Sequence, residues 1–327
     1  MRVLINGFGR IGRTLLRQIL TNPVHADITV AGINDIAALE TCAYLFRYDS
    51  VFGPFPGSVE HGPDALIVDG KAIAFSSFAD LSQADLTGVD LVLECTGKAQ
   101  TRHVAERGLT AGARAVLISG PSDAADVTAV LGANEEAIGN ASIVSNASCT
   151  TNAIAPLLKA LDSALGIARA HITTIHCYTG SQPTVDAPAA TLERSRAAAV
   201  SMVPTSTSAA TQVTRVLPSM ADKLTVSAVR VPCISVSAID AVLQFERPIE
   251  AIKDRLRDLF QDSPLIGITN DLCVSTDMRA QPESLVLALP ETRTLGDHQM
   301  RLFGWYDNEW GFSARMIDMA RLMAARS

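Results

Sequence analysis

The sequence predicts an α/β protein with two domains, a doubly wound parallel sheet followed by an α+β domain with a mostly antiparallel sheet. The chain has 327 residues, about twice the usual length of one domain. In the first 148 residues, short apolar strands alternate with helical or loop segments, an order that gives parallel pairing through right-handed crossovers. After residue 165, longer β-rich runs replace this order, which indicates antiparallel strands.

The first domain is expected to span residues 1–148 and to open with a strand, a glycine turn and a helix. Residues 3–5 form a β-rich run, and Ile11, Leu15 and Ile19 then recur at helical spacing. Further strands of this domain are predicted at residues 28–35, 89–97, 114–120 and 142–146.

The second domain is expected to span residues 149–311. One helix is predicted within it, with Pro248 near its start and Leu256 on its apolar face. The closing segment, residues 312–327, has helical character and is expected to pack on the first domain. The β-rich runs of the second domain are residues 171–178, 223–245 and 283–289.

Composition argues against several classes of function. The net charge of −7 gives no general attraction for nucleic acid or anionic lipid, so an anionic ligand must be met by local donors. No run approaches the roughly 20 apolar residues of a membrane span, and none resembles a signal sequence. The six cysteines lack CxxC pairs, which fits a reducing cytoplasm and does not fit a structural metal site.

Gly7, Gly9 and Gly12 form a GxGxxG motif between the first strand and the first helix. Such a turn lets backbone approach a pyrophosphate, whose charge the helix N-terminus stabilises. Taken alone, the three glycines are also compatible with an ordinary turn. Asp35 follows 23 residues after Gly12, at the end of the next strand, where a carboxylate accepts hydrogen bonds from a ribose. Because Asp35 would repel a 2′-phosphate, the motif favours NAD over NADP.

Cys149 lies in SNASCTTN, where a strand gives way to helical spacing, and Ser148 is a candidate N-cap. A thiol in the first helical turn faces unsatisfied N–H groups, so we expect its pKa to be lowered. Pro156 would kink this helix or move its start downstream. His176, at the end of a strand, is the candidate base for the thiol, although from spacing alone a single histidine on a strand is more often structural.

Six motifs together carry a resemblance over essentially the whole chain: INGFGRIGR, NASCTTN, TTIH before YTG, RAAAVSMVPTSTSAA, VRVP and WYDNEWGF. They resemble, in order and spacing, the phosphorylating glyceraldehyde-3-phosphate dehydrogenase family. The resemblance implies a Rossmann-type NAD-binding domain and a catalytic and tetramerisation domain in a cytoplasmic homotetramer. It also implies NAD-dependent oxidation and phosphorylation of D-glyceraldehyde 3-phosphate to 1,3-bisphosphoglycerate, a reaction of glycolysis and gluconeogenesis.

The resemblance assigns roles to residues by matching position. Cys149 resembles the nucleophile that forms a hemithioacetal and then a thioester, which inorganic phosphate cleaves, and His176 resembles its base. The implied cofactor-binding positions are Gly9, Arg10, Ile11, Asp35, Thr96, Gly97, Ser119 and Asn308, the last for the nicotinamide carboxamide. The implied phosphate-binding positions are Thr179 and Arg230 for the substrate, and Ser148, Thr150, Arg194, Arg196, Thr207 and Ser208 for the attacking phosphate. No metal is implied.

Some positions depart from the family pattern and leave alternatives open. Ser181 removes a carboxylate that is common beside the substrate phosphate, and Ser208 replaces a usual glycine. Erythrose-4-phosphate dehydrogenase, or another sugar-phosphate aldehyde dehydrogenase of the family, is the first alternative activity. A catalytically silent, NAD-binding thiol sensor is a remote alternative, and the use of NADP stays open.

Overall fold

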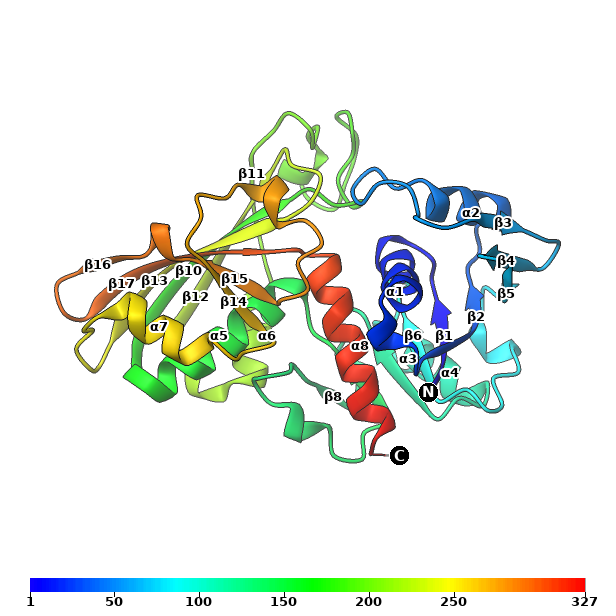
Figure 1. Cartoon of the computed structure of the whole chain (residues 1–327), viewed down its shortest axis with the longest axis horizontal. Coiled ribbons are helices and arrows are strands. Elements are labelled where there is room, and N and C mark those ends of the chain that lie inside the picture. Colours follow the sequence, from blue (N-terminus) through cyan, green and yellow to red (C-terminus); the bar gives the residue numbers. More distant parts are fainter. Residues whose placement is uncertain (327) are drawn as a thin grey trace. The chain divides into compact units, whose positions relative to one another are not determined.

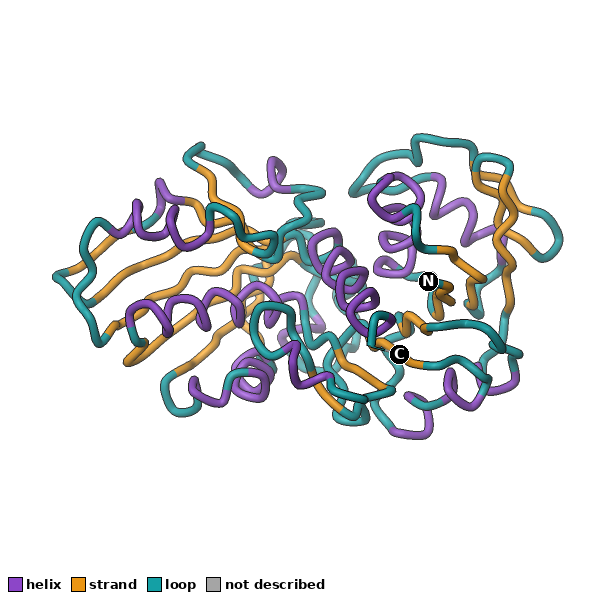
Figure 2. The backbone as a smooth tube through the Cα atoms, turned by 60° about the horizontal axis from the view of Figure 1, so that its bottom comes forward, coloured by secondary structure: helices purple, strands orange, loops and turns teal. Residues whose placement is uncertain are grey.

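A computed structural model describes residues 1–326 and divides the chain into two compact units. The first unit consists of Met1–Ala129, Glu135–Ser148 and the C-terminal residues from Ser313 onward. The second unit consists of Val130–Asn134 and Cys149–Phe312. Each unit contains its own β-sheet with helices beside it (Figures 1 and 2), which confirms the predicted α/β class.

The first unit has a nine-stranded sheet in the order β3-β4-β5-β2-β1-β6-β7-β9-β8. The strands in the run β5-β2-β1-β6-β7-β9-β8 pair in parallel, as predicted. Strands β3, β4 and β5 form an antiparallel extension of the sheet. The strands are β1 (Arg2–Asn6), β2 (Thr29–Asn34), β3 (Val59–His61), β4 (Ala65–Val68), β5 (Lys71–Ser76), β6 (Leu91–Glu94), β7 (Ala115–Ile118), β8 (Val127–Thr128) and β9 (Ile143–Ser145). The helices are α1 (Arg10–Thr21), α2 (Leu39–Arg47), α3 (Arg102–Ala105), α4 (Arg107–Thr110) and most of α8 (Trp310–Ala324).

The antiparallel extension was not predicted from the sequence. Its β4–β5 hairpin turns at Asp69 and Gly70, both of which have positive φ (49° and 75°). Asp-Gly is the dipeptide that a type I′ hairpin turn favours, because its twist matches that of the flanking strands. This local signal was present in the sequence.

The second unit has a mixed, mostly antiparallel sheet in the order β11-β12-β10-β13-β17-β15-β14, and β16 pairs with β17. Only the β10–β12 and β14–β15 pairs in it are parallel. The strands are β10 (Ile167–Cys177), β11 (Val203–Thr205), β12 (Leu224–Val231), β13 (Ser237–Phe245), β14 (Ile266–Thr269), β15 (Leu285–Ala288), β16 (Arg293–Leu295) and β17 (Gln299–Tyr306). The helices are α5 (Cys149–Leu165), α6 (Ala209–Val216) and α7 (Ile252–Phe260).

Two predicted elements of the second unit differ from the structure. The β-rich run 223–245 is two strands, β12 and β13, because the segment around Pro232 leaves the sheet. Helix α7 begins at Ile252 rather than beside Pro248, because the preceding Ala251 has the left-handed conformation (φ 45°), which α-helix does not continue.

The glycine turn of the first unit depends on close backbone contacts. Gly7 has φ 91°, and a Cβ there would lie 2.7 Å from the backbone nitrogen of Thr96. A Cβ on Gly12, inside α1, would overlap the carbonyl oxygen of Gly7. A Cβ on Gly9 would meet no protein atom within 4 Å. Gly7 and Gly12 therefore serve the fold, whereas the space beside Gly9 is open to a ligand.

We predict that Gly12→Ala destabilises the protein although alanine favours helix, because overpacking costs about 1–3 kcal/mol. The melting temperature should fall by roughly 2–12 °C. Gly9→Ala is the matched control and should keep the melting temperature while it weakens NAD binding. Thermal unfolding and calorimetric titration with NAD measure both effects. Equal melting temperatures for the two variants would contradict these assignments.

Candidate active site

Cys149 owes its position to a sharp turn between β9 and α5. Strand β9 ends at Ser145, and α5 begins at Cys149 itself. Between them, Ala147 is fully buried and has φ 52°, a conformation that costs a non-glycine residue about 1–3 kcal/mol. The Ser145 hydroxyl oxygen accepts a 3.2 Å hydrogen bond from the Ala147 N–H. This turn brings the thiol to the N-terminal end of the helix.

Buried apolar residues hold helix α5 in place. Its predicted apolar face is confirmed, since Ile154, Leu157, Leu161 and Leu165 have no exposed surface. Pro156 lies inside the helix without moving its start downstream. Packing of this face offsets the hydrogen bond that a proline removes.

The structure brings Cys149 and His176 together. Cys149 Sγ lies 3.6 Å from His176 Nε2. His176 comes from the end of β10 and is 6% exposed, and its ring packs edge-on against Tyr306, with 6.0 Å between centroids. The Tyr306 hydroxyl is hydrogen-bonded in turn to Thr150 (2.9 Å) and Thr174 (2.7 Å). The His176 imidazole therefore packs against a tyrosine ring that is itself held in place by hydrogen bonds.

His176 is neutral at physiological pH. Burial, with the charge of Arg230 as the second cause, lowers its pKa to about 4. Nδ1 lies 2.7 Å from the Cys177 carbonyl oxygen, to which it donates in the tautomer that leaves the Nε2 lone pair facing the thiol. Nε2 can therefore accept a proton from Cys149.

The prediction that the pKa of the Cys149 thiol is lowered is wrong. Burial raises the pKa of Cys149 and outweighs the opposing effects of Arg230, Thr150 and the helical N–H groups. The pair therefore rests as a neutral thiol and a neutral imidazole. Burial also raises the pKa of Cys42 to about 11 and of Cys95 to about 12, so both thiols stay protonated at physiological pH.

Arg230 lies beside His176 on the neighbouring strand β12. Its Nη1 donates to the Cys177 carbonyl oxygen at 2.8 Å and lies 2.9 Å from His176 Nδ1. Burial lowers the pKa of Arg230, and within residues 1–326 no carboxylate pairs with it. A half-buried cation without a carboxylate favours a bound anion.

The remaining predicted phosphate-binding residues differ in the contacts that they make. The Thr179 hydroxyl contacts that of Ser181 at 3.0 Å. Arg194 Nε donates to Thr205 at 2.7 Å, and the Arg194 charge contributes to lowering the pKa of His176. Arg196 instead points to Asp186, at 2.9 Å, and is mostly exposed. Of the two arginines, only Arg194 lies where its charge acts on the thiol's base.

The other hydroxyl candidates lie at the ends of two helices. Thr150 is buried in the first turn of α5, and Ser148, partly exposed, precedes it. Thr207 Oγ1 accepts from the Ala209 N–H at 3.1 Å. Ser208 is exposed at the N-terminus of α6, where its side chain caps no N–H group.

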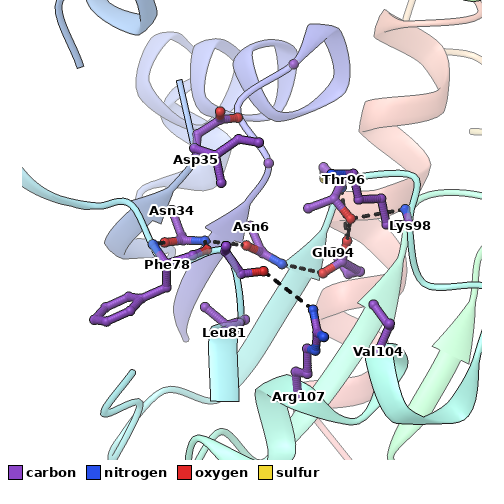
Figure 3. Close-up of a pocket in the computed structure, with 15 residues that line it drawn as sticks. Asn6, Asn34, Asp35, Phe78, Leu81, Glu94, Thr96, Lys98, Val104 and Arg107 are labelled. Carbon is purple, nitrogen blue, oxygen red and sulfur yellow. Dashed lines mark hydrogen bonds between the residues drawn. The ribbon is translucent and has the colours of Figure 1, made fainter. Parts of the chain in front are cut away.

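The first unit contains a cavity of about 250 Å³ at the carboxyl ends of its parallel strands (Figure 3). Strand β1 pairs with β2 on one side and β6 on the other, so the strand order reverses here, and such switch points bind ligands in open α/β sheets. Asn6, Asn34 and Glu94 end these strands as register partners and line the cavity. Asn34 Nδ2 donates to Asn6 Oδ1 at 2.8 Å, and Asn6 Nδ2 donates to the Glu94 carboxylate.

Three predicted cofactor residues, Gly9, Asp35 and Thr96, line this cavity. The Asp35 carboxylate is fixed by the Phe8 N–H (2.6 Å) and the Ala37 N–H (2.8 Å). Its orientation and the open space beside Gly9 fit the ribose and pyrophosphate of a dinucleotide. The predicted residues outside the lining are Arg10, Ile11, Gly97, Ser119 and, in the second unit, Asn308.

Sequence reasoning missed several lining residues. Asn6, Asn34 and Glu94 end the observed strands β1, β2 and β6, and their polarity after a run of apolar residues was the available signal. Arg107 also points into the cavity, with Nη1 near the Ala79 carbonyl oxygen (Figure 3), and no sequence signal indicated it.

Over residues 1–326, no three His, Cys, Asp or Glu side chains are grouped as metal ligands would be. No helix in that range combines the length and apolar character needed to cross a membrane.

The depressed pKa of His176 predicts a pH-dependent stability. The unfolded histidine takes up a proton below about pH 6.5, the folded one only near pH 4, so the stabilising contribution is complete above pH 6.5 and is lost towards pH 4. The free energy of unfolding in urea should fall between pH 7.5 and 4.5 by about 2 kcal/mol more for the wild type than for His176→Gln. His171→Gln, an exposed histidine of the same strand, is the control. Parallel losses in wild type and His176→Gln would contradict the neutral buried imidazole.

Comparison with known proteins agrees with this geometry. Residues 1–102 match the NAD binding domain of glyceraldehyde 3-phosphate dehydrogenase, and residues 148–308 match its C-terminal domain. A glyceraldehyde-3-phosphate dehydrogenase of Xanthobacter flavus is 45% identical over 99% of this chain and 98% of its own length. Proteins of the same name from Pseudomonas aeruginosa and Streptomyces coelicolor are 44% and 40% identical, over 99% and 98% of this chain and 98% and 97% of their own lengths. The chain therefore belongs to the glyceraldehyde 3-phosphate dehydrogenase family and carries that family's NAD binding domain.

Proposed function

We propose that this protein is an NAD-dependent, phosphorylating glyceraldehyde-3-phosphate dehydrogenase that converts D-glyceraldehyde 3-phosphate and inorganic phosphate into 1,3-bisphosphoglycerate. The observation that carries the proposal is the 3.6 Å contact of the Cys149 thiol with a neutral His176, beside an arginine without a carboxylate partner. The names of relatives at 40–45% identity support the same activity.

Cys149 and His176 carry the proposed covalent chemistry. The sulfur bonds to the aldehyde carbon while Nε2 takes the thiol proton and passes it to the carbonyl oxygen, which gives a hemithioacetal. His176 then accepts the hydroxyl proton as the carbon loses a hydride, and a thioester on Cys149 results. When bound, NAD supplies the hydride acceptor. A phosphate oxygen attacks the thioester, the carbon–sulfur bond breaks, and His176 returns a proton to the sulfur.

Two sets of side chains are proposed to hold the two phosphates. Arg230 and Thr179 would bind the phosphate of the aldehyde, because a guanidinium gives a firm charge-assisted contact. Hydroxyl groups and helix N-termini would bind the phosphate that must arrive and leave. This second set is Ser148, Thr150, Arg194, Thr207 and Ser208.

The first unit is proposed to bind NAD through Gly9, Asp35 and Thr96, and Asn308 of the second unit to bind the nicotinamide carboxamide. We further propose a cytoplasmic homotetramer that assembles through residues 180–203. Large apolar side chains exposed in this segment support it, since Leu192 is 91% and Val200 80% exposed. All six cysteines are free, which supports a reducing compartment.

The assay that tests the function measures NADH formation from D-glyceraldehyde 3-phosphate with and without phosphate. We expect turnover that requires phosphate and that Cys149→Ser abolishes while NAD binding persists. Equal rates without phosphate would overturn the phosphorylating step. A preference for D-erythrose 4-phosphate would move the assignment to the erythrose-4-phosphate enzyme, and NAD binding without any aldehyde oxidation would indicate a silent sensor.

Arg230→Gln should separate substrates by their charge. The loss of a charge-assisted hydrogen bond, about 1.5–3 kcal/mol, should raise KM for D-glyceraldehyde 3-phosphate roughly 10- to 100-fold. KM for unphosphorylated D-glyceraldehyde should change much less. Arg257→Gln, an exposed arginine of α7 that pairs with Asp254, serves as the control. A parallel change for both aldehydes would place Arg230 outside the phosphate site.

A further inference from the structure

Asn308 sits just beyond the end of β17, where three adjacent strands bring polar groups together. Its side chain is 8% exposed. Cys177 ends β10, and Ser237 begins β13, the strand between β10 and β17. Both of these residues are 1% exposed. The three side chains therefore form one buried polar cluster.

The hydrogen bonds of this cluster converge on one atom. Asn308 Oδ1 accepts from the Cys177 thiol at 3.2 Å and from the Ser237 hydroxyl at 3.4 Å. Ser237 Oγ is itself held by the backbone N–H of Cys177, at 3.2 Å. Since Ser237 Oγ accepts that N–H, its own proton is left to donate to Asn308.

Cys177 remains a donor at physiological pH. Burial raises the pKa of its thiol to about 12, so the proton that points to Asn308 is retained. A thiol is a weak hydrogen-bond donor, which is why the Ser237 hydroxyl matters beside it. With both donors in place, turning the amide over would set its NH₂ group against two protons.

The other end of the Asn308 amide has no such partners. Within residues 1–326, no side chain or carbonyl accepts a hydrogen bond from Nδ2. Asn308 is more than nine-tenths buried and its oxygen is already occupied, so its amide nitrogen is a hydrogen-bond donor with a fixed direction. It is available to a ligand that carries an acceptor.

We propose that Cys177 and Ser237 are positioning residues that fix the Asn308 amide so that it offers its N–H group, and not its oxygen, to the cofactor. This inference rests on the proposed function, in which Asn308 binds the nicotinamide carboxamide. Asn308 then donates a hydrogen bond to the carbonyl oxygen of that carboxamide and accepts none from its NH₂ group. A cofactor with a 3-acetyl group keeps the carbonyl and should satisfy Asn308 as well as NAD does.

The test compares equilibrium binding of NAD and of 3-acetylpyridine adenine dinucleotide by calorimetric titration. In the variant Cys177→Ala/Ser237→Ala, Oδ1 is released and the amide can turn, so it can also accept from the carboxamide NH₂ that the acetyl analogue lacks. We expect the affinity ratio of NAD to analogue to rise about 2- to 10-fold over wild type. Cys177→Ala should give a smaller rise, and Cys177→Ser, which retains a donor, should restore the wild-type ratio.

Cys233→Ala, which removes another thiol of the same unit, is the matched control and should keep the wild-type ratio. Melting temperatures identify variants that fail to fold, and Ser237→Ala alone then replaces the double variant. An unchanged ratio in folded Ala variants, or identical behaviour of Cys177→Ser and Cys177→Ala, would overturn the positioning role. If the wild type oxidises the aldehyde, either of these results in the variants would leave the proposed function intact. A wild type that does not bind NAD would overturn both.

Discussion

The candidate active site depends on an arginine, a neutral imidazole and one carbonyl oxygen at the ends of two parallel strands. Arg230 and Nδ1 of His176 both meet the Cys177 carbonyl, and the arginine charge helps to keep the imidazole unprotonated. Because β10 and β12 place His176 and Arg230 in register, the sheet itself sets this contact. The base is therefore prepared by the fold before any substrate arrives.

Features that depend on local spacing were predictable from the sequence. The glycine turn at Gly7–Gly12, the strand before it and the start of α5 at Cys149 follow from a motif or from helical periodicity. Features that depend on strand order were not. Asn6, Asn34 and Glu94 are far apart in the chain and meet only because β1 lies between β2 and β6. The protonation state of Cys149 was mispredicted because burial, a tertiary property, outweighs the helix terminus.

Both units place hydrogen-bonded polar side chains at the ends of their strands. In the first, amide and carboxylate groups close a hydrogen-bonded row beside the cavity. In the second, Cys177, Ser237 and Asn308 form a comparable row at the ends of β10, β13 and β17. In each row, the hydrogen-bonding groups of one side chain are occupied by its neighbours. The direction of the donors that remain is therefore set by packing rather than by solvent.

The missing carboxylate beside Arg230 has a consequence for reagents other than the substrate. An uncompensated cation in a partly desolvated site creates a local positive potential, and Cys149 lies within its reach. This potential should favour the approach of negatively charged electrophiles and oxidants, such as haloacetates or peroxyanions, over neutral ones of similar size. We expect salt in the medium to weaken such a preference for anions, because it screens the field.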